Sequence, residues 1–182
     1  MLKKRLFVDM DGVLAVFNYV NTKVMYGKGY FLNLKPQKNI VKAINSLMDI
    51  ENLDVFILSA YLVNSLYALE EKKLWLDKYM LDLKKENIIF TPVGSCKADY
   101  IGGINKSDYL IDDYTYNLKL WEEKGGTGIK LLNDLNHTKE TWRGNRINFN
   151  KNWEIVREDI LGIIFRGSKV FDSKPVRRMV VW

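Results

Sequence analysis

The sequence predicts an α/β protein with a three-layer, Rossmann-like parallel sheet that is covered by helices on both faces. Short apolar runs alternate along the chain with longer amphipathic segments, and short connections join them, which is typical of such a sheet. The chain has 182 residues, of which 47% are hydrophobic, enough for one domain with a substantial core. We therefore expect a single domain over residues 1–166 and a basic C-terminal tail over residues 167–182.

Each element of this sheet is predicted from its own stretch of sequence. Short apolar runs predict parallel strands at residues 6–8, 54–58, 88–90, 109–111 and 129–132. Helical spacing of apolar residues predicts helices at residues 38–48, 62–83, 98–101 and 153–165. The 62–83 segment carries many Lys and Glu residues, so we interpret its outer face as solvated and assign it no function.

Composition and charge narrow the class of protein. The single cysteine, Cys96, cannot form an internal disulfide, which favours a reducing compartment. The basic start of the chain resembles that of a signal peptide, but Asp9 and Asp11 interrupt the apolar stretch that would have to follow. No uncharged run approaches the ~20 residues of a membrane span. We expect a soluble, cytoplasmic protein without a membrane partner, and the net charge of +6 favours anionic ligands such as nucleotides or nucleic acid.

Polar side chains follow three of the predicted strands at the point where each strand ends. Asp9 and Asp11 follow the first strand, Ser59 follows the second, and Asp112 and Asp113 follow the fourth. Ligands of parallel sheets bind beyond the carboxyl ends of the strands, so we expect these groups to converge. Each also has a structural interpretation, as a turn residue or a helix cap. Their occurrence together favours a functional site.

Carboxylates from two strand ends form an oxygen-only cradle, which suits Mg²⁺. Two acids as close as Asp9 and Asp11, away from bulk water, either separate in pKa or share a cation. With a cation held by Asp9 and Asp112, Asp9 can attack phosphorus and form an aspartyl-phosphate. Asp11 can then protonate the leaving oxygen and later deprotonate the attacking water.

A phosphoryl group also requires donors that neutralise its oxygens. The Ser59 hydroxyl, the Lys97 ammonium and backbone N–H groups from Met10 to Gly12 can supply them. Gly12 additionally allows the backbone to turn close to a substrate. Because Lys97 alone can also be an ordinary surface lysine, its assignment depends on the other groups.

Four short segments together resemble the motifs of the haloacid dehalogenase (HAD) superfamily of phosphohydrolases. The segments are, in chain order, residues 9–15 (DMDGVLA), 58–60 (LSA), Lys97 and 110–113 (LIDD). The first motif, with residues 96–100 (CKADY) and 111–114 (IDDY), is similar to the 5'(3')-deoxyribonucleotidase group. The likeness covers residues 6–148 and implies a HAD-like fold and Mg²⁺ as cofactor.

The resemblance implies a role for each matching residue of the metal site. Asp9 would be the nucleophile and a metal ligand, and Asp11 would be the acid and base that also gives its backbone carbonyl to the metal. Asp112 would complete the metal site, and Asp113 would lie behind the metal ligands and support them or would hold a metal-bound water.

The resemblance also implies how phosphate is bound. Ser59 would hold the phosphate, and Lys97 would steady both Asp9 and the phosphoryl group. Lys106 is an alternative lysine, but it lies six residues before Asp112, where the chain should be entering the fourth strand. We therefore prefer Lys97.

Two features depart from the deoxyribonucleotidase pattern. Val16 stands where that group commonly has a carboxylate before Phe17. Only 47 residues, 12–58, separate Asp11 from Ser59, so the large helical cap of the family is replaced by at most a small lid over about residues 17–36. The lid contains five aromatic residues that can stack on a base or pack on the sheet: Phe17, Tyr19, Tyr26, Tyr30 and Phe31.

Four residues are candidate substrate contacts. They are Phe17, Tyr61, Trp142 and Arg143. Trp142 and Arg143 can clamp a nucleotide or its phosphate, or Trp142 can simply cover the core. His137, the only histidine, lies in a polar loop where we expect it to be exposed and inert.

We therefore expect a Mg²⁺-dependent phosphomonoesterase that hydrolyses nucleoside or deoxynucleoside monophosphates through an aspartyl-phosphate. One alternative is an enzyme of the same chemistry that removes phosphate from the end of a polynucleotide, which an open site and a basic chain would admit. Another is a phosphate-binding regulatory module without turnover. The presence of both Asp9 and Asp11 argues against that module, because loss of turnover would tolerate loss of the second acid.

Overall fold

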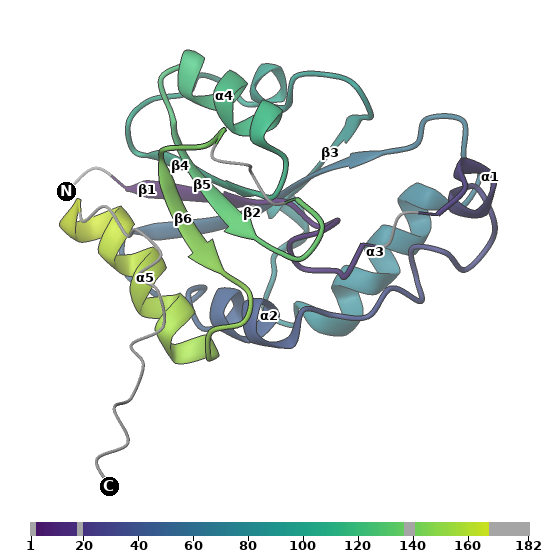
Figure 1. Ribbon diagram of the computed structural model, residues 1–182, viewed down its shortest axis with the longest axis horizontal. Coiled ribbons are helices and arrows are strands. Elements are labelled where there is room, and N and C mark those ends of the chain that lie inside the picture. The colour runs from purple at the N-terminus through teal and green to yellow at the C-terminus, as the bar shows by residue number, and fades with distance from the viewer. Residues whose placement is uncertain (1–2, 18–19, 137–140, 168–182) are drawn as a thin grey trace, which may run out of the picture.

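A six-stranded, fully parallel sheet forms the middle layer of this computed structural model (Figure 1). The strands are β1 (Lys4–Val8), β2 (Leu53–Tyr61), β3 (Ile88–Pro92), β4 (Asp108–Asp112), β5 (Thr127–Leu132) and β6 (Asn145–Asn148). Their order in the sheet is β3-β2-β1-β4-β5-β6. The structure describes residues 3–17, 20–136 and 141–167, so the expectations for Tyr19, His137 and the basic tail lie outside it.

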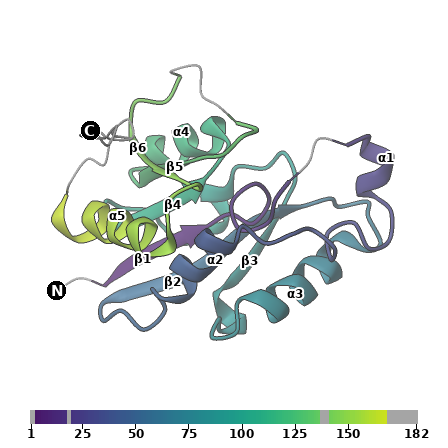
Figure 2. The same ribbon diagram turned by 60° about the horizontal axis from the view of Figure 1, so that its bottom comes forward.

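Helices cover both faces of the sheet, as the sequence predicted (Figures 1 and 2). One side carries α2 (Lys38–Asn45), α3 (Ala68–Tyr79) and α5 (Trp153–Arg166), and the other carries α4 (Thr115–Glu123) and the 3₁₀ turn η2 (Lys97–Tyr100). Side chains of β1 alternate between the two layers, since Leu6 and Val8 belong to the larger core and Phe7 to the smaller. The predicted fold class is confirmed.

The order of the strands places a switch point between β1 and β4. The chain continues from β1 to β2 on one side and from β4 to β5 on the other. Val8 pairs with Ile111, so the residues that follow, Asp9 and Asp112, lie next to each other at the carboxyl ends of these strands. The crevice at such a point is where ligands of open parallel sheets bind.

Several elements differ from their prediction. The predicted 62–83 helix is limited to α3, because the Ser65 hydroxyl accepts the N–H of Ala68 at its start and Met80 leaves helical geometry at its end. Strand β6 was not predicted, since Ile147 is its only apolar residue and it pairs with β5 alone. The helix α4 follows Asp113 and was anticipated only as a helix that Asp112 or Asp113 could cap.

The chain between β1 and α2 makes a short excursion in place of a large cap. Its base is closed by two hydrogen bonds, from the Val16 N–H to the Lys35 carbonyl (2.8 Å) and from the Gln37 N–H to the Leu14 carbonyl (2.7 Å). We call residues 20–34 the excursion loop. It contains α1 (Thr22–Met25), which lies at the end of the molecule away from α5 (Figures 1 and 2).

Two further features complete the description. The 3₁₀ turn η1 (Lys85–Asn87) leads into β3. Among the described residues, no helix combines the length and the apolar character that crossing a membrane requires.

Candidate active site

Three carboxylates meet at the switch point between β1 and β4. Asp9, Asp112 and Asp113 are buried, and one oxygen of each lies within 4.8 Å of the others. Burial and the neighbouring carboxylates raise the pKa of Asp113 to about 7, and burial is also the main cause that raises the pKa of Asp112. A divalent cation bound by these oxygens would remove the repulsion, and an all-oxygen donor set fits Mg²⁺.

Lys97 joins two of these carboxylates. It is the first residue of η2, and its Nζ lies 2.8 Å from Asp9 Oδ1 and 2.7 Å from Asp112 Oδ2. Burial opposes the charge of Lys97, but the two carboxylates outweigh it and raise the pKa of this ammonium. Lys106, the alternative lysine, is exposed in the loop before β4, at the opposite end of that strand.

A tight turn after β1 brings Gly12 against the carboxylate cluster. Gly12 has φ of +80°, and a Cβ built on it would lie 2.2 Å from Asp113 Oδ2. The Asn133 amide donates to both the Gly12 carbonyl and Asp113 Oδ2, each at 2.8 Å. The turn is therefore built for glycine, and its carbonyl is tied to the residue that follows β5.

The backbone N–H groups of this turn differ in availability. The Gly12 N–H donates to the Ala15 carbonyl at 2.8 Å, so it is already used within the turn. In the part of the chain that the structure describes, the N–H groups of Met10 and Asp11 have no backbone acceptor. Met10 and Asp11, rather than Gly12, thus offer the N–H groups that an anion could accept.

Asp11 is held by a buried lysine that the sequence analysis missed. Lys72 of α3 is fully buried, and its Nζ lies 2.5 Å from Asp11 Oδ2. The other oxygen, Asp11 Oδ1, is buried and has no hydrogen-bond partner among the described residues. Burial raises the pKa of Asp11, and the positive charge of Lys72 opposes that rise.

Ser59 lies behind this pair. Its hydroxyl is 3.1 Å from Lys72 Nζ. The residue is buried and does not line the open cavity that lies over Asp9 and Asp11. The same ammonium donates to the Ala60 carbonyl at 2.7 Å. The phosphate-binding role expected for Ser59 therefore stays a prediction.

An open cavity of about 270 Å³ lies over Asp9 and Asp11. Its wall is mostly apolar and aromatic. The other lining residues are Phe17, Met25, Phe31, Ala60, Tyr61, Leu62, Val93, Asp113, Tyr114 and Asn136. Two of the predicted substrate contacts, Phe17 and Tyr61, thus lie beside the carboxylates.

The other two predicted substrate contacts lie elsewhere. Trp142 is buried in the smaller core, where its Nε1 donates to the Asn145 carbonyl at 2.8 Å and its ring packs against Gly128. Arg143 beside it is exposed, and neither residue lines the cavity. The second interpretation of Trp142, a side chain that covers the core, describes its position.

Several supporting residues were missed from the sequence, and two carried a usable signal. Lys72 falls four residues after Ala68 and three before Trp75, so it lies on the apolar face of α3. Asn133 directly follows β5, at the same edge of the sheet as the predicted acids. The remaining partners are amides of loops and of α4: Asn117 donates to Asp112 Oδ2, and Asn136 to Asp113 Oδ2.

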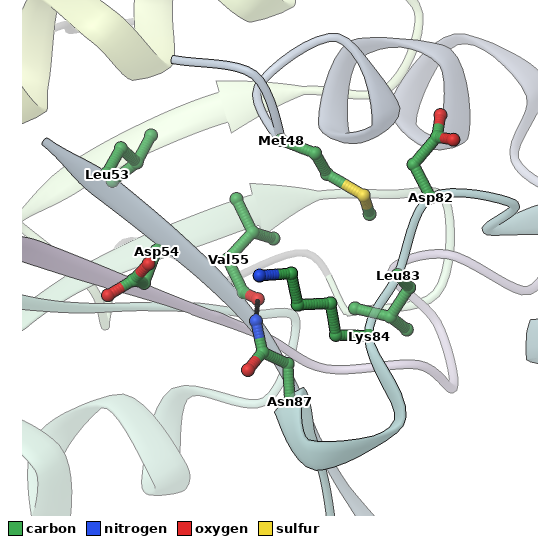
Figure 3. A pocket seen from close by; sticks show the side chains of 8 residues that line it. All are labelled: Met48, Leu53, Asp54, Val55, Asp82, Leu83, Lys84 and Asn87. Carbon is green, nitrogen blue, oxygen red and sulfur yellow. Dashed lines mark hydrogen bonds between the residues drawn. The ribbon is translucent and has the colours of Figure 1, made fainter. Parts of the chain in front are cut away.

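A second hollow of about 80 Å³ lies at the opposite end of the sheet (Figure 3). It is lined by the start of β2, including Leu53 and Asp54, and by Met48 and Asn87, whose amide donates to the Val55 carbonyl. None of the predicted site residues lines it. The predicted site residues therefore gather at the carboxyl ends of the strands and not at this hollow.

Comparison with known proteins gives likeness of fold only. No family model matches the sequence, and no curated protein matches it. Among solved structures, the chain is similar to D,D-heptose 1,7-bisphosphate phosphatase from Burkholderia thailandensis, with 13% identity, a TM-score of 0.60, and coverage of 87% of this chain and 99% of that one. It is also similar to the phosphatase of the same name from B. bronchiseptica, complexed with magnesium and phosphate, with 12% identity, a TM-score of 0.63, and coverage of 88% and 99%. The three-layer, Rossmann-like fold expected from the sequence is thereby confirmed.

Proposed function

We propose that this chain is a Mg²⁺-dependent phosphomonoesterase that hydrolyses nucleoside or deoxynucleoside monophosphates. The observation that carries the proposal is the group formed by Asp9, Lys97, Asp112 and Asp113, of which Asp9 and Asp113 line an open cavity. One fold neighbour is complexed with magnesium and phosphate, which supports the same ligands here.

The donor set of the site fits a hard divalent cation. The Asp9 and Asp112 carboxylates and the Asp11 backbone carbonyl would hold Mg²⁺, and Asp113 would hold a coordinated water. The bound ion would offset negative charge on the phosphoryl oxygens. Lys97 keeps Asp9 in place through its contact at 2.8 Å, and the free N–H groups of Met10 and Asp11 would donate to the phosphoryl oxygens.

The reaction proceeds in two displacements. A carboxylate oxygen of Asp9 bonds to phosphorus while the ester P–O bond breaks, and the leaving oxygen takes a proton from Asp11. Asp11 then removes a proton from water, whose oxygen bonds to phosphorus while the bond to Asp9 breaks. Inorganic phosphate leaves and both aspartates regain their initial state. Asp11 Oδ1 has no hydrogen-bond partner among the described residues, so this oxygen is not already engaged as an acceptor.

The wall of the cavity favours a leaving group that carries a planar base. Phe17, Phe31, Tyr61 and Tyr114 contribute aromatic surface beside the carboxylates, and aromatic rings stack favourably on nucleobases. The nucleotide assignment rests on this wall and on the sequence resemblance.

A panel of phosphomonoesters, assayed with Mg²⁺ and with excess chelator, tests the proposal. The panel contains ribo- and deoxyribonucleoside monophosphates with 5' or 3' phosphate, 5'- and 3'-phosphorylated oligonucleotides, and sugar phosphates. We expect Mg²⁺-dependent release of phosphate from mononucleotides that chelator abolishes. Preferential, salt-sensitive hydrolysis of oligonucleotide ends would instead support the polynucleotide-end phosphatase.

The panel needs a variant that separates binding from turnover. Asp11→Asn should retain Mg²⁺ and phosphate binding while phosphate release falls by at least about 100-fold, the contribution of a general acid and base. Asp99→Asn serves as a control, because Asp99 is exposed and pairs with Lys124 on the surface. Unchanged turnover in Asp11→Asn would exclude the acid and base assignment.

A further inference from the structure

We propose that Lys72 is a positioning residue, which holds the Asp11 carboxylate in one orientation for its proton transfers. The inference rests on the proposed function and adds to it a residue of α3 that does not line the cavity. Lys72 would act only through Asp11.

The contacts of Lys72 are complete. An ammonium has three donors, and all three have acceptors: Asp11 Oδ2 at 2.5 Å, Ser59 Oγ at 3.1 Å and the Ala60 carbonyl at 2.7 Å. The Phe31 ring lies over the same ammonium, with its centroid 4.9 Å from Nζ. The Lys72 ammonium is therefore held by the Asp11 carboxylate, by two residues at the end of β2 and by an aromatic ring.

Burying the Lys72 ammonium at this position costs free energy of folding. It is fully buried on a helix face whose other inward residues include Ala68, Trp75 and Leu76. Removing a lysine ammonium from water is unfavourable unless it is paired and hydrogen-bonded, and an apolar residue in such a place is often as stable or more stable. Stability alone therefore gives little reason for a lysine here, whereas holding a carboxylate does.

The ion pair with Lys72 gives the two carboxylate oxygens of Asp11 different contacts. Oδ2 is bound by Lys72, and Oδ1 is buried without a partner among the described residues. With Oδ2 bound, the carboxylate cannot turn freely, and Asp11 keeps one orientation in the wall of the cavity that it lines. Proton transfer depends on such placement, since an error of about 1 Å can cost about 100-fold in rate.

Lys72→Met tests the proposal, because methionine has a similar length and no charge. We expect kcat toward the best substrate of the panel to fall about 10- to 100-fold, with KM changed less than about threefold. Lys73→Met is the matched control, since Lys73 is the next residue of α3 and is exposed, 3.8 Å from Glu70. A rise in KM with unchanged kcat would overturn the proposal, because Lys72 would then bind substrate directly.

A double-mutant cycle distinguishes positioning from a general structural role. In the Asp11→Asn background, Lys72→Met should cause no further loss of kcat beyond about twofold, because Lys72 acts through Asp11 alone. A loss equal to that in the wild-type background would overturn the proposal.

A crystal structure of Lys72→Met provides a readout that needs no turnover. We expect the Asp11 side chain to change its χ angles or to occupy two conformers, and an unchanged single orientation would overturn the inference. If the wild-type chain hydrolyses no phosphomonoester while Asp11 still moves in Lys72→Met, the proposed function fails and the positioning contact stands.

Discussion

Gly12 lies where the chain tolerates no side chain, for two separate reasons. Its φ of +80° is unfavourable for other residues, and a Cβ would lie 2.2 Å from Asp113 Oδ2. Since Asp113 belongs to the carboxylate cluster, a change at this turn is transmitted directly to the candidate metal site.

We predict that Gly12→Ala destabilises the protein by about 2 kcal/mol or more and abolishes most of the proposed activity. Gly103→Ala is the matched control, because Gly103 has φ of +82° but no atom within 4 Å of a built Cβ. Urea unfolding and the phosphatase assay measure the two effects. If both variants lose the same stability and activity, the collision with Asp113 is irrelevant and only the backbone angle matters.

Single residues of the site were predictable where a strand ends in a polar group. Asp9 and Asp112 directly follow apolar runs, and their proximity follows from the pairing of Val8 with Ile111. That pairing is a long-range property, so the runs alone did not contain it. The expected convergence came from the rule that ligands bind beyond the carboxyl ends of parallel strands. Trp142 shows the converse, because an aromatic residue next to an arginine has the same local pattern in a binding site and over a core.

At the level of elements, α3 connects the excursion loop to the site through two adjacent residues. Lys72 contacts Asp11, and Glu71 accepts the N–H groups of Gly29, Phe31 (3.1 Å) and Leu32 (3.4 Å). Phe31 in turn lines the cavity. The wall of the cavity and the orientation of Asp11 therefore depend on the same helix.

We predict that Glu71→Gln loosens the excursion loop, because the neutral amide accepts these N–H groups more weakly. The free energy of unfolding should fall by about 1–3 kcal/mol, and the Phe31 amide should exchange with solvent faster. Hydrogen exchange followed by NMR measures the second effect. Glu70→Gln is the control, since Glu70 is 68% exposed, and equal exchange rates in both variants would contradict the role of Glu71.

The elements also show why some of the fold escaped prediction. The charge of α3 suggested a solvated helix, yet Glu71 and Lys72 are buried because each is paired, and pairing across the fold is invisible to local spacing. Strand β6 has a single apolar residue, and as an edge strand it is defined by its pairing with β5. Apolar periodicity predicts elements that bury their own side chains and misses those defined by tertiary partners.

For the molecule as a whole, the sheet order explains how a small chain builds the site. The switch point between β1 and β4 gathers Asp9, Asp112 and Asp113, and the excursion loop, with Phe17 and the loop after β2, supplies walls without a separate cap domain. Placing three acids in one buried cluster costs free energy of folding. This cost is largest when all three carboxylates are ionised.

That cost predicts how stability depends on pH. Because the pKa of Asp113 is raised to about 7 in the folded state, the folded protein binds this proton more tightly than the unfolded chain. Without metal, stability should therefore fall as the pH rises from about 4 to about 7 and stay low above that range. Thermal unfolding in the presence of chelator measures this decrease, and Asp113→Asn should reduce it.

Magnesium should reverse the loss, because a cation bound by the ionised cluster replaces the competing proton. At a concentration about 100 times its dissociation constant, Mg²⁺ stabilises the folded state by about 2.7 kcal/mol, which corresponds to a rise in Tm of about 5–10 °C. We expect this rise at pH 8 and a much smaller one at pH 5, where Asp113 is protonated. Asp112→Asn should lose the rise at both pH values. An equal Mg²⁺ effect at pH 5 and pH 8, or one that survives in Asp112→Asn, would place the bound ion outside this cluster.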